Sequence, residues 1–184
     1  MKAYVAGLLG LALCWTSGCA RHLERADTPP LVAKASPRAE SGPTCVGDLC
    51  LEDPAEEVLR ALGQPASKTE PVLEAATGET IEDWLYPPRG LSLTMANSED
   101  RPGQRLYRLS LSAPCDWSAY GGIRIGEGRQ KVASMLASLK GREGVSVDES
   151  EQAVGVLWED SYTQLTVIFE SDKVHQIYLG PGPE

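Results

Sequence analysis

The sequence predicts an α+β protein in which two tandem repeats, each a helix plus a four-stranded antiparallel sheet, join into one continuous curved sheet with the helices on one face. Three observations predict this fold class. The apolar pattern of the first half recurs in the second at an offset of about 74 residues, which places Trp84 over Trp158. Each half contains one segment with helical periodicity. Each half also contains a series of segments in which apolar and polar residues alternate, as in half-buried strands.

The chain begins with a segment typical of an export signal, residues 1–18. Lys2 supplies a positive start, and the apolar run Ala3–Trp15 follows it. This run is shorter than the roughly 20 residues that a helix needs to span a bilayer. The segment therefore predicts a cleaved signal peptide.

Small residues stand directly before Cys19, in the sequence Thr16-Ser17-Gly18. They resemble the lipobox of bacterial lipoproteins, and this resemblance implies cleavage before Cys19 and acylation of its thiol and new amino group. Cys14 fits the pattern less well, because the bulky Leu13 precedes it. Ala20 follows Cys19, and by the sorting rule known for enteric bacteria a residue other than Asp there implies the outer membrane.

Residues 19–46 are predicted to hold the lipidated Cys19 and a disordered tether. The tether is rich in proline and small residues and has no apolar period. The whole chain carries a net charge of −9. An acidic surface repels nucleic acid and anionic headgroups, so we expect no nucleic-acid partner and a membrane contact only through the N-terminal lipid.

The two predicted repeats span residues 47–113 and 123–181, joined by a connection at residues 114–122. In the first repeat, a short apolar stretch precedes a helix over residues 54–62 that Asp53 caps and Gly63 ends. Its predicted strands are Val72–Ala76, Thr80–Tyr86, Leu91–Ala96 and Arg105–Ser112. The second repeat is predicted to have a helix over residues 129–139, and its predicted strands are Val145–Asp148, Ala153–Glu159, Gln164–Glu170 and Val174–Leu179.

Several motifs follow the same order as in a known superfamily. The first helix ends in Leu62-Gly63-Gln64-Pro65, a tryptophan-bearing strand follows, and the last hairpin closes on Lys173-Val174-His175-Gln176-Ile177. This arrangement resembles the BamE (SmpA/OmlA) and β-lactamase-inhibitor-protein superfamily, and the tandem duplication is more similar to the inhibitor protein. The resemblance implies a protein-binding scaffold. Members include an outer-membrane lipoprotein of the β-barrel assembly machine and a protein that plugs β-lactamase active sites.

Signatures of catalysis or of metal binding are nearly absent from the sequence. It has two histidines: His22 falls in the tether, and His175 is expected on or beside the packed face of its strand, where it alternates with Ile177. No nucleophile elbow, zinc motif or phosphate loop occurs, and we interpret the glycine-rich Gly121–Gly126 as a hinge between the repeats. The sequence therefore predicts no catalytic residues, no cofactor and no metal.

Three cysteines other than the lipidated one remain after processing, which is an odd number for an oxidising compartment. The close spacing of Cys45 and Cys50 favours a disulfide between them. A bond from either one to Cys115 is the alternative.

Candidate binding residues fall on the sheet face that a single helix per repeat leaves uncovered. Arg108, Gln176 and Tyr178 alternate with apolar residues of their strands, and Arg and Tyr are favoured at binding hot spots. Trp84 and Trp158 recur at equivalent positions and either anchor the core or contact a partner on this face.

We therefore expect a lipid-anchored envelope protein at the outer membrane, facing the periplasm or the cell surface, that binds another envelope protein without catalysis. It would be a component of an outer-membrane or periplasmic assembly. The alternative is an inhibitor or immunity-type protein that blocks a periplasmic or secreted enzyme.

Overall fold

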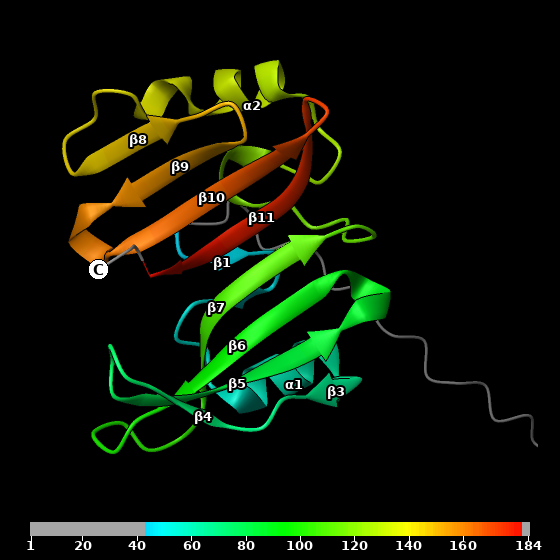
Figure 1. Ribbon diagram of the computed structural model, residues 1–184, viewed down its shortest axis with the longest axis vertical. Helices are drawn as coiled ribbons and strands as arrows, with labels where there is room; N and C mark the ends of the chain where they lie inside the picture. Colours follow the sequence, from blue (N-terminus) through cyan, green and yellow to red (C-terminus); the bar gives the residue numbers. More distant parts are fainter. Residues whose placement is uncertain (1–42, 182–184) are drawn as a thin grey trace, which may run out of the picture. The chain divides into compact units, whose positions relative to one another are not determined.

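One antiparallel sheet dominates the computed structural model, which describes residues 43–181 (Figure 1). Its nine strands follow the order β3-β5-β6-β7-β11-β10-β9-β8, and β4 is a second partner of β5 at the edge that β3 also occupies. The strands are β3 (Ser67–Lys68), β4 (Val72–Glu74), β5 (Glu79–Tyr86), β6 (Leu91–Asn97), β7 (Arg105–Ser112), β8 (Val145–Glu149), β9 (Ala153–Trp158), β10 (Thr163–Glu170) and β11 (Lys173–Pro181).

The two halves of the chain meet where β7 pairs with β11. This pairing joins four residue pairs, from Ser112 opposite Gln176 to Leu109 opposite Leu179. Each of these two strands also pairs along its other side, β7 with β6 and β11 with β10. The last strand of each half is therefore an interior strand of one shared sheet.

Two short helices add to the sheet. Helix α1 (Ala55–Leu62) and helix α2 (Arg129–Leu136) have eight residues each. Each begins beside a strand, because Pro54 forms a bridge with Arg105 and Gly128 forms one with Lys173. Gly63 ends α1 with a positive φ, and its N–H donates a hydrogen bond to the carbonyl of Leu59.

The hydrophobic core lies between the helices and one face of the sheet. Val58 and Leu62 of α1 and Val132 and Leu136 of α2 are buried there. The spacing of four residues in each pair puts both side chains on one side of the helix. The fully buried strand residues in the same core include Leu93, Leu106, Leu109, Leu111, Leu165, Val167 and Ile177.

A small hairpin, β1 (Cys45–Val46) with β2 (Leu49–Cys50), adds to this core. Figure 1 shows β1 behind the junction of β7 and β11. A disulfide joins Cys45 to Cys50, and Val46 and Leu49 are buried. The third cysteine, Cys115, is a buried free thiol, and burial raises its pKa. A thiol in such surroundings stays protonated and reacts slowly.

Removing this disulfide, as in the double variant Cys45→Ala/Cys50→Ala, is expected to lower the free energy of unfolding by about 2 kcal/mol, because the bond closes a loop of about six residues in the unfolded chain. Urea unfolding of the variant and of the parent measures the difference. The single variant Cys115→Ala is the control for loss of a thiol. If the double variant unfolds at the same urea concentration as the parent, the hairpin does not depend on the bond.

The predicted fold class, two helix-plus-four-stranded repeats, is wrong. The structure is mostly β, with one nine-stranded sheet and two eight-residue helices. The halves are also unequal. The first contributes five strands, because the two-residue strand β3, which was not predicted, pairs with β5 in addition to β4, which was predicted as Val72–Ala76. The short apolar stretch before each helix forms a strand only at Leu49–Cys50, and the matching residues 123–125 form none.

One helix boundary and one helix cap also differ from expectation. The predicted second helix ran to residue 139, but its last three residues, Ala137–Leu139, form a 3₁₀ turn. Asp53 does not cap α1. Its carboxylate accepts a hydrogen bond from the N–H of Cys50, at 2.7 Å, and so holds the end of the disulfide hairpin instead.

Some predictions concern residues outside the described range. The signal peptide of residues 1–18, the lipidated Cys19, His22 and most of the predicted tether lie there. The folded part includes Cys45 and Val46, so it begins earlier than residue 47, where the first repeat was predicted to start. Within residues 43–181, no helix is long and apolar enough to cross a membrane.

Candidate protein-binding face

The sheet face opposite the two helices, which we call the open face, carries mainly small and polar side chains. They alternate along the strands with the buried residues of the core. A row of directly paired residues crosses its middle: Ser92, Ser110, Tyr178, Thr166 and Gly155. All five are half-buried. Figure 1 shows the sheet from this side, with α1 behind β5.

A β-bulge between β6 and β7 brings an additional aromatic residue to the open face. Thr94 pairs with Arg108 and Met95 pairs with Leu106, so Tyr107 has no partner of its own in the ladder. Bulges redirect side chains in this way. The guanidinium of Arg108 lies over the Tyr107 ring, 4.6 Å from its centroid.

Arg108 is the centre of a polar group on this face, which we call the Arg108 cluster: Glu74, Tyr107, Arg108 and Tyr178. Nη2 of Arg108 donates a hydrogen bond of 2.6 Å to Oε1 of Glu74, from the β4–β5 hairpin. Thr77 donates to the other carboxylate oxygen of Glu74 at 3.1 Å. Three strands that are distant in sequence, β4, β7 and β11, therefore meet at one carboxylate–guanidinium pair.

Electrostatics within the Arg108 cluster reflect partial burial. Burial raises the pKa of both Tyr107 and Tyr178, and the positive charge of Arg108 partly opposes this rise. Burial by itself would lower the pKa of Arg108, but the hydrogen bond and charge of Glu74 outweigh it and raise that pKa. The tyrosines are therefore neutral donors and acceptors at physiological pH, beside a guanidinium that is always charged.

The ring of Tyr178 lies over Gly180 on the same strand. A Cβ built at Gly180 would be 2.5 Å from the Tyr178 hydroxyl oxygen and 3.0 Å from Cγ of Arg108. The absence of a side chain at Gly180 thus lets Tyr178 and Arg108 lie flat against the sheet.

The variant Gly180→Ala is expected to push the Tyr178 ring away from the sheet and to lower the raised pKa of its phenol toward the ordinary value, because the displaced ring is less buried. Stability should change by less than about 1.5 kcal/mol, because the atoms displaced are the ends of side chains that can rotate. Absorbance titration of tyrosinate measures the pKa, with a Tyr178→Phe protein to assign it. Gly155→Ala is the matched control on the same face, where the nearest atom is 3.5 Å from the new Cβ. An unchanged titration in Gly180→Ala would mean that Tyr178 does not lie over this residue.

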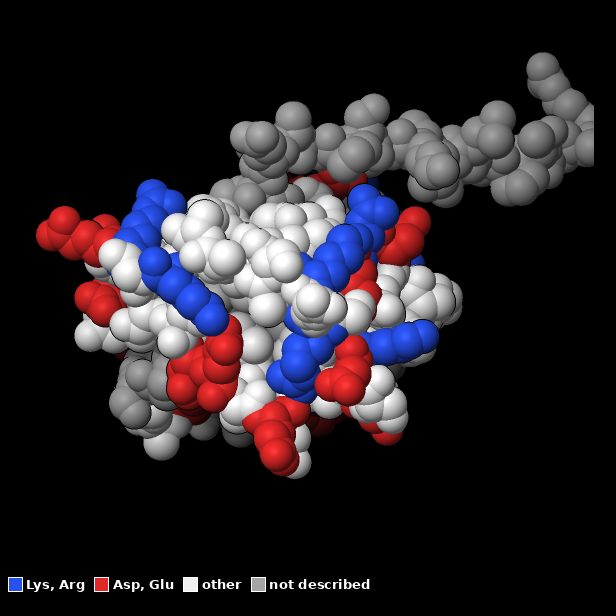
Figure 2. Space-filling model, turned by 90° about the horizontal axis from the view of Figure 1, so that it is seen from above, with Lys and Arg blue, Asp and Glu red and all other residues white. Residues whose placement is uncertain are grey.

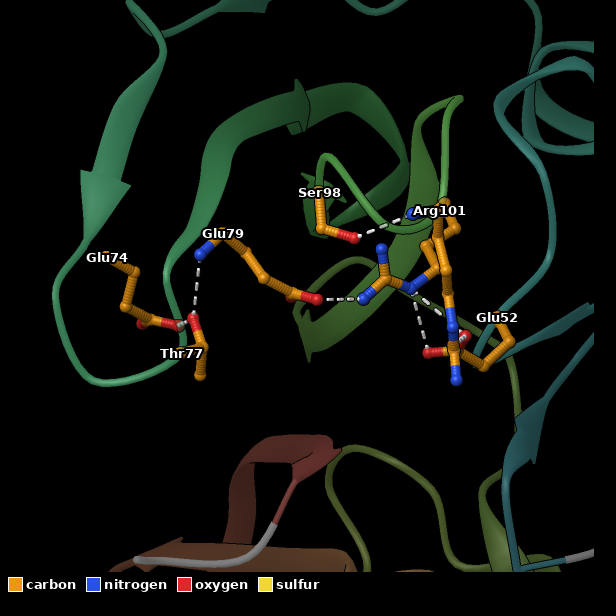
Figure 3. A network of polar contacts seen from close by, with 7 residues as sticks. Glu52, Glu74, Thr77, Glu79, Ser98 and Arg101 are labelled. Atoms are coloured by element: carbon orange, nitrogen blue, oxygen red, sulfur yellow. Dashed lines mark hydrogen bonds and ion pairs between the residues drawn. The ribbon is translucent and has the colours of Figure 1, made fainter.

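A second ionic network lies near Glu74 of the Arg108 cluster (Figure 3). Arg105 forms ion pairs with Glu79 and with Glu52, and Arg101 pairs with Glu52 at 2.7 Å. The side chains of Arg105 and Glu79 are only 12% and 15% exposed. The network ties the β4–β5 hairpin to β7 and to the turn before α1, so it fixes the hairpin that carries Glu74.

Charge is mixed on the side of the molecule that Figure 2 shows. Figure 2 shows acidic and basic side chains interspersed around an uncharged area when the molecule is seen from above. Among residues 43–181, no group of three or more His, Cys, Asp or Glu side chains is arranged to hold a metal ion.

Three of the predicted binding residues lie on the open face. Arg108 and Tyr178 meet in the Arg108 cluster, and Gln176 lies two residues before Tyr178 on β11, opposite Ser112. All three are half-buried.

The other two predicted binding residues, Trp84 and Trp158, lie in the core instead. Trp84 is 1% exposed and Trp158 is 8% exposed. Lys68 covers the ring of Trp84 at 3.8 Å, and Tyr120 packs edge-on against Trp158 with ring centroids 5.1 Å apart. Of the two roles considered for these residues, the structure places both in packing.

His175 was expected on or beside the packed face, but its side chain is 60% exposed, and its Nδ1 lies 3.1 Å from a carboxylate oxygen of Glu170. A second bulge is the reason. Ile168 pairs with Gln176 and Phe169 pairs with Val174, so His175 is the extra residue of β11 and leaves the alternation.

Sequence reasoning missed Glu74 and Tyr107. Glu74 reaches Arg108 only because the β4–β5 hairpin folds back over the sheet, and Tyr107 faces outward only because of the bulge. Neither feature leaves a signal in the apolar pattern of one sequence.

No family model, no curated protein and no solved structure matches this chain.

Proposed function

We propose that this protein is a lipid-anchored envelope lipoprotein that binds another envelope protein through its open face, without catalysis. The Arg108 cluster is the observation that carries the proposal. Arginine and tyrosine are the residue types enriched at the energetic centres of protein interfaces. Here two tyrosines and an arginine are already packed together on a sheet face, so binding would need little ordering of side chains.

The surroundings of the cluster support the same function. Small side chains such as those of Ser92, Ser110 and Thr166 surround Tyr178 and project little from the sheet, so a partner surface could approach this area closely. These side chains are polar but uncharged, and charged residues are depleted at the core of interfaces. The Cys19 lipid would keep this face at the outer membrane, where the partner would be a component of an outer-membrane or periplasmic assembly.

Site-specific photo-crosslinking in cells tests the proposal. A photo-reactive amino acid at Ser92, on the open face, is expected to give a crosslinked protein product. The same residue at Ser134, which is exposed on α2, is the matched control on the opposite side and should give little of that product. Equal products from both positions, or none from Ser92, would count against the open face as the binding surface.

The identity of the crosslinked partner assigns the role. A barrel protein or an envelope-machine component supports an assembly function. A soluble periplasmic or secreted hydrolase would assign the protein as an inhibitor. Recovery of a small-molecule product with measurable turnover by the purified protein would contradict a non-catalytic role.

A further inference from the structure

We propose that Arg108 recognises a carboxylate of the partner, and that Glu74 is the internal carboxylate which occupies this position until the partner arrives. This inference rests on the binding function proposed above. It narrows the partner to a protein that presents an Asp or Glu side chain to the space between Tyr107 and Tyr178.

The geometry of the Glu74–Arg108 pair is the first argument. The hydrogen bond that joins them uses a single guanidinium nitrogen, Nη2. A guanidinium offers five N–H donors in a planar fork and binds carboxylates best through two parallel bonds. The internal pair therefore does not use the full capacity of Arg108 for a carboxylate. The guanidinium also forms hydrogen bonds with the hydroxyls of Tyr107 and Tyr178. These bonds to neutral groups are weaker than the bonds that a partner carboxylate would form in their place.

Accessibility is the second argument. The side chains of Arg108 and Glu74 are 28% and 20% exposed, whereas Arg105 of the neighbouring pair is only 12% exposed. Arg105 is also held by two carboxylates, Glu52 and Glu79. Of these two arginines on β7, Arg108 is the one that a partner can reach, and Arg105 serves to fix the hairpin.

The surroundings of Arg108 are the third argument. Its guanidinium lies over Tyr107, and its stem packs beside Gly180 and Tyr178. Partner atoms that cover these rings would exclude water and strengthen a guanidinium–carboxylate bond in the same place. Within the pair, the cation is the more exposed member, at 28% against 20% for Glu74, so a partner reaches the positive charge more readily, which favours an acidic side chain.

A small carboxylate probe tests the inference without the partner. The full lipidated chain in detergent micelles is titrated with N-acetyl-aspartate N-methylamide, and the NMR signal of the Arg108 side-chain N–H is followed. In Glu74→Gln, half-saturation is expected at a concentration about two to five times lower than in the parent, since a partly exposed ion pair competes only weakly. The asparagine analogue of the probe should not shift the signal. If the aspartate probe fails to shift Arg108 in Glu74→Gln, or if both probes act alike, the inference is wrong.

A charge swap separates recognition from a purely structural role. The double variant Glu74→Arg/Arg108→Glu keeps an ion pair between the hairpin and β7 but removes the cation from position 108. If Arg108 recognises a carboxylate, crosslinking from Ser92 should fall by at least about tenfold in the swap and in Arg108→Gln. If the pair only holds the hairpin, the swap should crosslink like the parent.

Two further outcomes keep this test decisive. Should the swap fail to fold by urea unfolding, Glu74→Gln still discriminates, because recognition predicts more crosslinking and a structural role predicts less. Should the parent give no crosslink from Ser92, the proposed function fails, and the probe titration alone decides whether Arg108 binds carboxylates.

Discussion

Replacement of Gly90 by alanine is expected to lower the free energy of unfolding by about 4 kcal/mol or more, one of the largest effects a single methyl group can have in this protein. Gly90 ends the 3₁₀ turn Pro87–Arg89 in a left-handed conformation, with φ of 63°. A Cβ there would be 2.1 Å from the carbonyl oxygen of Ser112 and 2.8 Å from the backbone nitrogen of Cys115. These are backbone atoms, so no side-chain rotation can relieve the overlap.

The position of Gly90 explains why the backbone cannot move away. Its carbonyl accepts a hydrogen bond of 2.9 Å from the N–H of Ser112, at the end of β7. The next residue, Leu91, is buried and pairs with Leu111. A shift at Gly90 would therefore disturb the β6–β7 ladder, which carries Arg108.

Gly78→Ala is the matched control for this variant. Gly78 also has a positive φ, of 72°, but no atom lies within 4 Å of the added Cβ. It should cost only the conformational penalty of about 1–2 kcal/mol. Urea unfolding of both variants and the parent gives the comparison. Similar losses in the two variants would show that the close backbone contact at Gly90 contributes nothing.

Strands β4 to β11 could be predicted from sequence because side-chain alternation depends on burial alone. Arg108 and Tyr178 were placed on the open face for this reason: their neighbours Leu109 and Ile177 are fully buried. The same reasoning cannot predict β-bulges, since a bulge depends on how two strands pair. This is why His175 was misplaced and Tyr107 was missed.

The fold class failed because matching apolar positions between the halves show which residues are buried, but not how much of each half is helix and how much is strand. Each half has one helix of only eight residues, whereas nine strands form the shared sheet. The pairing of β7 with β11 brings together residues more than 60 positions apart, such as Leu109 and Leu179. The lengths of the helices also depend on this shared sheet, because packing rather than intrinsic propensity stabilises short helices.

Replacement of Cys19 by alanine is expected to abolish incorporation of labelled palmitate and to move the protein from the membrane fraction to the soluble periplasmic fraction. The proposed lipids at Cys19 are several acyl chains on one residue, which anchor far more firmly than one chain. Radiolabelled palmitate and cell fractionation after a high-salt wash measure the two effects. A Cys19→Ala protein that still incorporates palmitate would refute the assignment of the lipidation site.

Cys14→Ala is the matched control, because it removes a cysteine from the apolar run of the signal peptide and leaves the lipobox intact. It should be labelled and localised like the parent.

The soluble Cys19→Ala protein also distinguishes the role of the lipid anchor from that of the open face. Addition of the carboxylate probe to this protein should still shift the NMR signal of the Arg108 side-chain N–H. Crosslinking from Ser92 in cells should fall, because the protein is no longer concentrated at the membrane where the proposed partner resides. Retention of full crosslinking by the released protein would place the partner in the soluble periplasm and would favour the inhibitor alternative over an outer-membrane assembly.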